Sequence, residues 1–447
     1  MATETGVPTE LPVEERILRV LQHLGIRQAH FAGLTAGDWG GIAARYPDCI
    51  TSLTLVCPIG MTSDLLAPLA SRLLVFTGDQ GLSARAVQRS VESLTDAEVI
   101  VFNNYESFLY SDIVADFTDK ISSVMRGFLE RVNSVEHHMS ASKSDEAGEV
   151  AGITYRIQGA GPPLVLLPLG LARSQWGPIV PYLADKFCLI TLGGAHLGSI
   201  RDLEIRARTG FKSIVRNLME ELDIADGESV LDVGCGSGAN ARDLANRTGG
   251  NNPITAVDYS PYMIAEAKSI ARSQGMEEVI NFREGDAEAL PFPESSFDVV
   301  FSVTVMEEVN SNQMMAELVR VVKRGGRIGV IVRANDSSWV VNLPISDSIK
   351  RKVEPPGTMG GGAVEGGCAD RSLYSRFVQA GLNRINASAQ LATFGEGPLT
   401  LRFEAQVLGV LSSEEAEEWR EAAAQAKAEG TFFIAMPLHC AVGTKPG

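Results

Sequence analysis

A short apolar run that leads into closely spaced glycines constrains this chain most. Residues 229–233 read Ser-Val-Leu-Asp-Val, which is typical of a buried strand, and a helix is predicted from about Asn240 to Arg247. Between them stand Gly234, Cys235, Gly236, Ser237 and Gly238. Glycine lets the backbone turn sharply and approach a ligand closely. The free N–H groups at the start of the helix favour an anion, so this unit predicts a ligand site in an α/β fold, with a pyrophosphate or a carboxylate as the anion.

Acidic residues follow the next two predicted strands. The strand Pro253 to Val257 ends in Asp258, roughly 20 residues beyond the glycines, where a carboxylate can accept both hydroxyls of a ribose. Tyr259, Pro261 and Met263 open a helix, and the strand Val279 to Arg283 leads to Gly285, Asp286 and Ala287. The Asp286 carboxylate could accept a hydrogen bond from an adenine amino group. Further strands are predicted at 297–302 and 327–332, with a helix at 317–322 between them.

The order VLDVGCGSG, VDYSPYMIAEAK, GDAEALPFPESSFDVVFS and ELVRVVKRGGR resembles the class I S-adenosylmethionine-dependent methyltransferases, and most of all their ubiquinone and menaquinone biosynthesis branch. The resemblance covers roughly Phe211 to Gly447. It implies a Rossmann-like, seven-stranded sheet that ends in an antiparallel hairpin including Thr431 to Thr444. It also implies S-adenosyl-L-methionine as cofactor and methyl transfer to a small molecule. The implied cofactor contacts are Asp232, Gly234, Cys235, Gly236, Gly238, Asp258, Tyr259, Met263, Asp286, Ala287 and Val303.

The region after the fourth strand departs from the family pattern. Many relatives carry a Glu-His or His-His pair there, and this chain has Glu307 and Glu308. Two adjacent carboxylates at the mouth of a cleft could include a base with a raised pKa, so both are candidate catalytic residues. The alternative is that one faces solvent and the other caps a helix.

The methyl acceptor is predicted to bind near residues 333–344, which follow the fifth strand and include Trp339 and Asn342. The glycine-rich segment 355–367 comes next and could close over the acceptor. Alternatively, Trp339 packs in the core, and the acceptor then lies toward residues 211–216.

A second resemblance lies in the N-terminal half. Residues 33–37, Gly-Leu-Thr-Ala-Gly, follow a predicted strand at 29–32 and match the position of the nucleophile elbow G-x-S-x-G of α/β-hydrolases. Asp79 would match the acid of the triad. Thr35 replaces the serine, however, and the expected loop 103–107, Asn-Asn-Tyr-Glu-Ser, lacks a histidine. Without a base to activate the hydroxyl, the resemblance implies a non-catalytic module.

The two parts of this hydrolase pattern stand in reversed order. Residues 152–199 resemble the start of a hydrolase, although they follow the elbow region. Either the two pieces close into one circularly permuted sheet or they are fragments of two modules. One sheet leaves fewer exposed edges, so we favour it, with residues 134–149 as a linker. The predicted domains are 1–200, hydrolase-like, and 206–447, methyltransferase-like.

Composition limits the partners. The 447 residues carry a formal net charge of -16, which disfavours nucleic acid, and no apolar run approaches the roughly 20 residues of a membrane span. The six cysteines form no CxxC pair, so no metal site is expected. We expect a cytoplasmic enzyme and leave room for a homo-oligomer. The competing hypotheses are an esterase with a regulatory cofactor-binding domain and a non-catalytic scaffold.

Overall fold

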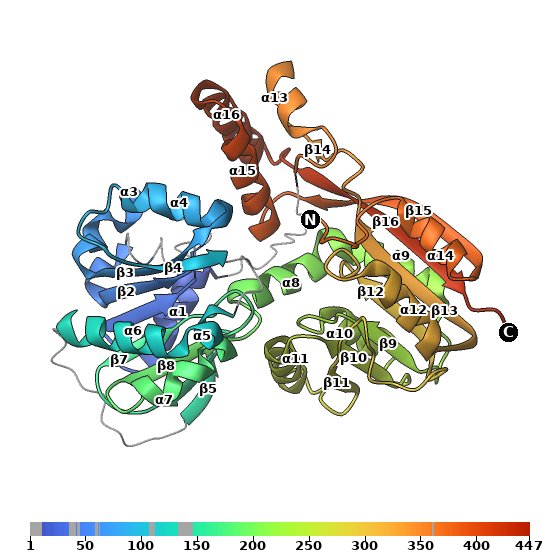
Figure 1. The fold of residues 1–447 in the computed structure, drawn as a ribbon, viewed down its shortest axis with the longest axis horizontal. Helices are drawn as coiled ribbons and strands as arrows, with labels where there is room; N and C mark the ends of the chain where they lie inside the picture. Colours follow the sequence, from blue (N-terminus) through green and yellow to red (C-terminus); the bar gives the residue numbers. More distant parts are fainter. Residues whose placement is uncertain are drawn as a thin grey trace, which may run out of the picture. The chain divides into compact units, whose positions relative to one another are not determined.

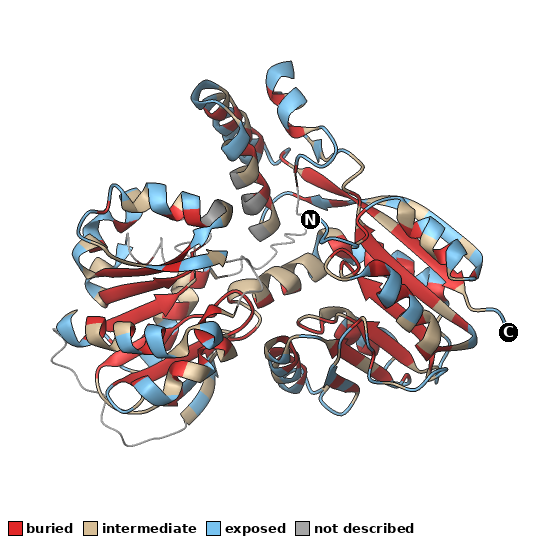
Figure 2. Ribbon diagram, viewed as in Figure 1, coloured by how far each residue is buried: buried red, intermediate tan, exposed pale blue. Residues whose placement is uncertain are grey.

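The computed structural model describes residues 11–34, 42, 45–58, 61, 63–106, 112–132, 146–359 and 362–447. The chain divides into two compact units, Met1–Arg201 and Asp202–Gly447, and each unit is described by itself (Figure 1). In both units the strands are largely buried, and helices flank the sheets (Figure 2).

The N-terminal unit contains an eight-stranded sheet in the order β4-β3-β2-β1-β7-β8-β6-β5. The strands are β1 Ala29–Gly33, β2 Ile50–Val56, β3 Leu73–Gln80, β4 Glu98–Glu106, β5 Glu146–Val150, β6 Ile153–Gln158, β7 Pro163–Leu166 and β8 Cys188–Gly193. β1 and β7 pair in parallel, with His30 opposite Leu164. Two segments that are far apart in the sequence, 29–106 and 146–193, therefore build one sheet.

Helices cover both faces of this sheet. They are α1 Val13–His23, α3 Ser63–Leu66, α4 Gly81–Val91, α5 Ile113–Asp116, α6 Thr118–Val132 and α7 Val180–Leu183, with short 3-10 turns at Pro47–Cys49, Ala67–Arg72 and Arg173–Ile179. One apolar cluster joins Ile17 of α1 to the sheet, and a second joins Met125 of α6 to the other face. Because both faces are covered, the inner strands β1 and β2 are buried at every position, as parallel strands usually are.

Two expectations for this unit are wrong. Residues 146–149, expected in the linker, belong to β5, because Ala151 (φ 53°) and Gly152 (φ 77°) form a two-residue turn that lets Val150 pair with Ile153. Residues 103–106, expected in a loop, continue the edge strand β4 beyond a register shift in its pairing with β3. Gly33 of the predicted nucleophile elbow ends β1, whereas Thr35, Ala36 and Gly37 lie outside the described residues.

The C-terminal unit has a second eight-stranded sheet, ordered β11-β10-β9-β12-β13-β16-β14, with β15 on the other side of β16. The strands are β9 Val230–Val233, β10 Ile254–Asp258, β11 Ile280–Glu284, β12 Phe297–Val303, β13 Val322–Arg333, β14 Val340–Val341, β15 Asn383–Phe394 and β16 Ile434–Thr444. β9 to β13 are parallel, and β16 runs antiparallel to β13 and β15. The expected count of seven misses β14, a two-residue strand that pairs with the start of β16.

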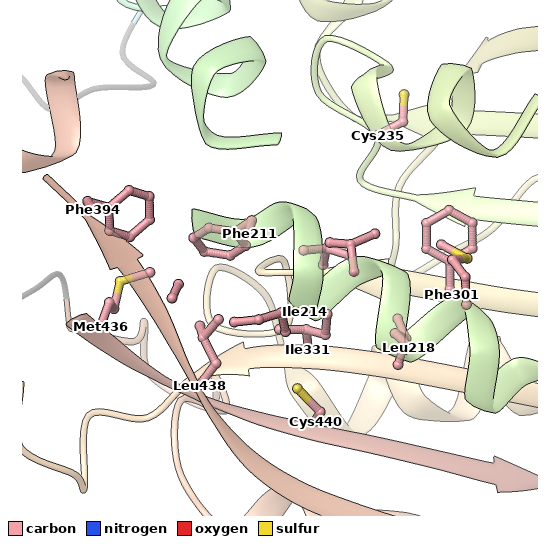
Figure 3. Packing of buried hydrophobic residues seen from close by; sticks show 14 of the residues in the cluster. Phe211, Ile214, Leu218, Cys235, Phe301, Ile331, Phe394, Met436, Leu438 and Cys440 are labelled. Atoms are coloured by element: carbon pink, nitrogen blue, oxygen red, sulfur yellow. The ribbon is translucent and has the colours of Figure 1, made fainter. Parts of the chain in front are cut away.

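The helices of this unit are α8 Gly198–Arg208, which begins before the unit boundary, α9 Gly210–Leu222, α10 Ala239–Arg247, α11 Pro261–Ser273, α12 Ser311–Val321, α13 Asp347–Val353, α14 Ser372–Gln379, α15 Pro398–Val410 and α16 Ser413–Glu429. Phe211, Ile214 and Leu218 of α9 pack against β13 and β16 residues such as Ile331 and Leu438 (Figure 3). α10 and α11 contribute to the same cluster, whereas α12 and α14 pack on the opposite face. The carboxyl ends of β9, β10 and β12 lie at one edge of the sheet, the edge at which open α/β sheets bind ligands.

Candidate active site

Three glycines shape the loop between β9 and α10. Gly234, Gly236 and Gly238 have φ angles of 74°, 53° and 76°, a region that other residues rarely adopt. A Cβ atom at Gly238 would lie 2.6 Å from the ring of Phe282, and one at Gly234 would collide with the side chain of Val305. Backbone conformation and close packing therefore both require glycine at these positions.

Asp258, the last residue of β10, holds this loop. Its Oδ2 accepts the Gly236 N–H at 2.8 Å, and its Oδ1 accepts the Ser260 N–H at 3.0 Å. Burial raises the pKa of Asp258, although the hydrogen bonds from Ser260 and Gly236 oppose that shift. Ser260 caps α11 by accepting the Met263 N–H at 3.3 Å, so the end of β10 is rigidly placed.

Asp232 is a buried carboxyl group directly before the loop. It is 1% exposed, and its Oδ2 has no hydrogen-bond partner among the described residues. Burial and then the charge of Asp258 raise the pKa of Asp232 to about 8. A buried carboxyl oxygen without a partner is costly, so a ligand that donates a hydrogen bond or carries a positive charge would be favoured here.

The other predicted cofactor contacts differ in exposure. Met263, Ala287, Val303 and Cys235 are 5–7% exposed, and Cys235 and Val303 border one small cavity. Tyr259 is 79% exposed. Asp286 is exposed too, and its Oδ1 accepts the Glu288 N–H at 2.8 Å. Thus the structure brings the glycine loop, Asp232 and Asp258 together at one edge of the sheet, with the ring of Tyr259 in solvent.

A small cavity lies beside the glycine loop. It measures about 20 Å³, which is room for a single water molecule. Its lining comes from α8, α9, the loop, the start of α10 and β12: Leu203, Arg206, Ala207, Phe211, Val215, Cys235, Ser237, Ala239, Asn240 and Val303. Phe211 and Val215 belong to the segment 211–216 that the sequence singles out as the alternative acceptor region. This cavity would have to widen before an acceptor molecule could enter it.

Glu307 and Glu308 both contact Arg333 at the end of β13. Glu307 is fully buried, and its Oε1 accepts the Arg333 N–H at 2.8 Å, whereas its Oε2 has no partner among the described residues. Glu308 pairs with the Arg333 guanidinium at 3.2 Å. The expectation that one of them caps a helix is wrong, because Asn310 caps α12. Burial raises the pKa of Glu307, although Arg333 opposes the shift.

Trp339 and Asn342 make contacts beyond β13. The half-buried Trp339 ring stacks on Phe403 of α15 with centroids 4.9 Å apart, and the Asn342 side chain donates to the Thr431 carbonyl at 2.7 Å. In the glycine-rich segment, the Val364 N–H donates to the Glu307 carbonyl at 2.9 Å. The described part of this segment is therefore tied to the loop after β12.

One group of site residues was missed by the sequence reasoning. Glu204 of α8 accepts hydrogen bonds from the Ser237 hydroxyl at 2.6 Å and from Arg242 at 2.5 Å. Glu204 precedes Ser237 by 33 positions and belongs to no motif, so no local signal could have indicated it.

Other charged groups of the unit have partners away from this edge. Lys323 pairs with Asp298 at 2.8 Å, and Arg327 pairs with Glu228 at 2.6 Å, so two of the three basic residues in the segment 323–327 have an acidic partner. Over the described ranges, no three His, Cys, Asp or Glu side chains gather as metal ligands. None of the helices that the structure describes has the length and apolarity needed to cross a membrane.

Comparisons with known proteins agree with this geometry. Residues 231–330 match the family model described as a methyltransferase domain. The chain carries an S-adenosylmethionine-dependent methyltransferase domain. The methyltransferase GfsG of Streptomyces halstedii is 35% identical over 118 residues, which cover 26% of this chain and 42% of that protein. The demethylmenaquinone methyltransferase of Lactobacillus johnsonii is 26% identical over 161 residues, or 36% of this chain and 65% of that protein.

The chain was also compared with solved structures. The YcgJ protein from Bacillus subtilis aligns with a TM-score of 0.35 at 17% identity, covering 52% of this chain and 98% of that one. This chain spans less than two thirds of the length of either curated relative, 42% and 65%.

Proposed function

We propose that this protein transfers the methyl group of S-adenosylmethionine to a small-molecule acceptor. The observation that carries the proposal is the junction of the glycine loop with Asp232 and Asp258 at the carboxyl edge of the sheet. The residues fit this cofactor, because the buried Asp232 Oδ2 has no partner among the described residues and a hydrogen-bond donor or cationic group of the cofactor would satisfy it. The cofactor supplies a methyl group already activated on a sulfonium sulfur.

The chain's own residues would bind and orient the two reactants. Each oxygen of Asp258 accepts one backbone N–H, and a carboxylate has four lone-pair sites, so both ribose hydroxyls can still be bound. Asp232 would face the cationic end of the methionine part. The N–H groups at the start of α10 would face its carboxylate. The buried residues Met263, Ala287 and Val303 would exclude water around the nucleoside.

We propose that the acceptor lies along the same edge, toward the loops after β12 and β13. Glu307 is the candidate base there, because it is buried, has a raised pKa and keeps one oxygen without a partner in the described structure. Its neighbour Glu308 would hold Arg333 and thereby orient Glu307. Trp339 and Asn342 remain predicted acceptor contacts, and the Trp339 side chain is only partly buried. The demethylmenaquinone methyltransferase is named for a small molecule, which supports an acceptor of that size.

We further propose that the N-terminal unit is a non-catalytic, hydrolase-like module whose two halves have exchanged their order. The parallel pairing of β1 with β7 supports one permuted sheet. The Asp79 carboxylate accepts the Tyr105 N–H at 3.1 Å, a structural contact rather than one to a histidine.

The test of function is a titration with S-adenosylhomocysteine, followed by turnover assays with a panel of phenols, quinols and hydroxy acids. We expect the protein to bind S-adenosylhomocysteine. We also expect it to convert S-adenosylmethionine into S-adenosylhomocysteine when a suitable acceptor is present. A chain that binds no S-adenosylhomocysteine would refute the proposal. A nitrophenyl ester assay tests the N-terminal unit, and ester hydrolysis that disappears in Thr35→Ala would overturn its non-catalytic role.

A further inference from the structure

We propose that Glu204 of α8 is a positioning residue that holds the glycine loop in the shape that binds the cofactor. The inference rests on the proposed function and extends it to a helix outside the matched residues 231–330. It concerns a buried group of three side chains, Glu204, Ser237 and Arg242, which we call the clasp.

The clasp holds Ser237 from two sides. Glu204 Oε1 accepts the Ser237 hydroxyl at 2.6 Å and an N–H of Arg242 at 2.5 Å. The other terminal nitrogen of Arg242 donates to the Ser237 carbonyl at 2.5 Å. The side chains of Glu204 and Arg242 are each 4% exposed, so solvent does not compete for these bonds.

Ser237 is the point where the loop can be held. It stands between Gly236 and Gly238, and a glycine residue restricts its own φ and ψ angles little. Asp258 holds Gly236 from the β10 side, and the clasp holds the next residue from the α8 side. The loop N–H groups are then ordered before a ligand arrives, which lowers the entropy lost on binding.

α8 also covers the loop directly. A Cβ atom at Gly236 would lie 3.0 Å from Leu203, the neighbour of Glu204, and Leu203 borders the small cavity beside the loop. α8 begins at Gly198, and the first compact unit ends within it at Arg201. A residue of the helix that connects the two units therefore shapes the loop of the second unit.

The decisive experiment separates positioning from stability. Glu204→Gln keeps a hydrogen-bond acceptor but leaves the buried charge of Arg242 without its counter-ion, so both stability and binding should fall. Replacing a buried ion pair by apolar residues of similar volume often leaves stability near that of the parent. The double variant Glu204→Leu/Arg242→Met removes both charges in this way. For each protein, the affinity for S-adenosylhomocysteine is measured by calorimetry and the thermal midpoint by scanning calorimetry.

We expect the double variant to unfold somewhat below the parent's temperature, because the buried Ser237 hydroxyl loses its acceptor, and to bind S-adenosylhomocysteine about fivefold to tenfold more weakly. Glu204→Gln should show a similar loss of affinity with a lower midpoint. The matched control is Glu228→Gln, which disrupts the Arg327–Glu228 pair before β9, at the opposite edge of the sheet, and should leave affinity unchanged.

Parent-like affinity in the folded double variant would show that the clasp serves stability alone and would overturn the inference. If the double variant does not fold, parent-like affinity in folded Glu204→Gln does the same. A parent protein that binds no S-adenosylhomocysteine would instead overturn the proposed function, and the inference with it.

Discussion

Replacing Asp258 by alanine tests the cofactor assignment most directly. The parent carboxylate would accept two ribose hydroxyls, and a hydrogen bond to a charged group contributes roughly 1.5–3 kcal/mol. Both oxygens already accept a backbone N–H, from Gly236 at 2.8 Å and from Ser260 at 3.0 Å. We therefore assign to the two ribose hydrogen bonds together the free energy of one such bond. We therefore expect Asp258→Ala to weaken S-adenosylhomocysteine binding roughly 10-fold to 150-fold, measured by isothermal calorimetry.

The same change should lower stability, and a control separates the two effects. Without Asp258 the N–H groups of Gly236 and Ser260 lose their acceptor, at a cost of about 1–2 kcal/mol in the free energy of unfolding, measured with urea. Asp298→Ala also removes a strand carboxylate that accepts a backbone N–H, from Ser229 at 2.9 Å, but at the other edge of the sheet. It should cost stability and leave affinity intact. Unchanged affinity in folded Asp258→Ala would refute the ribose assignment.

Three further predictions follow from single residues. Because the free protein holds Asp232 with a pKa of about 8, affinity for a ligand with a cationic group should rise with pH up to about 8, and Asp232→Asn should flatten that profile in calorimetric titrations. Burial alone would raise the pKa of Asp298, yet the hydrogen bonds from Lys323 and Ser229 lower it to about 2. A carboxyl group whose pKa is lowered in the folded state stabilises the fold at pH values above its unfolded pKa near 4. At pH 7 we therefore expect Asp298→Asn to be roughly 1 kcal/mol less stable than the parent in urea titrations, and this difference should shrink as the pH falls from 4 toward 2. A difference that stays constant over this pH range would contradict the assignment. Trp339→Ala should lower the free energy of unfolding by about 2 kcal/mol and impair turnover, with the affinity for S-adenosylhomocysteine unchanged. Trp339→Phe keeps an aromatic ring stacked on Phe403 and should retain turnover. Normal turnover in folded Trp339→Ala would place the acceptor site elsewhere.

The parts of the site that the sequence predicts are those set by neighbouring residues. Gly234, Gly236 and Gly238 adopt positive φ angles because a strand must turn into α10 within a few residues. Asp258 lies at the end of β10, as its place after an apolar run indicates. Even the hairpin that contradicts the linker is local, since Ala151 and Gly152 form its turn. This turn is hard to recognise in the sequence, because alanine is seldom found at positive φ. The polar, serine-rich composition of the preceding residues therefore indicated a linker instead.

The sequence alone determined the glycine loop, the positions of the carboxylates that flank it and the alternation of strands and helices, because each depends on backbone conformation and periodicity over a short stretch. Tertiary structure alone decided which distant groups meet there. Glu204 reaches Ser237, and Glu307 reaches the backbone of Arg333, through the packing of elements far apart in the chain. The closure of β1 onto β7 is of the same kind. Such contacts produce no periodic pattern in the sequence, because each joins a single pair of groups. The hydrogen bond becomes necessary only when the fold has removed both groups from water.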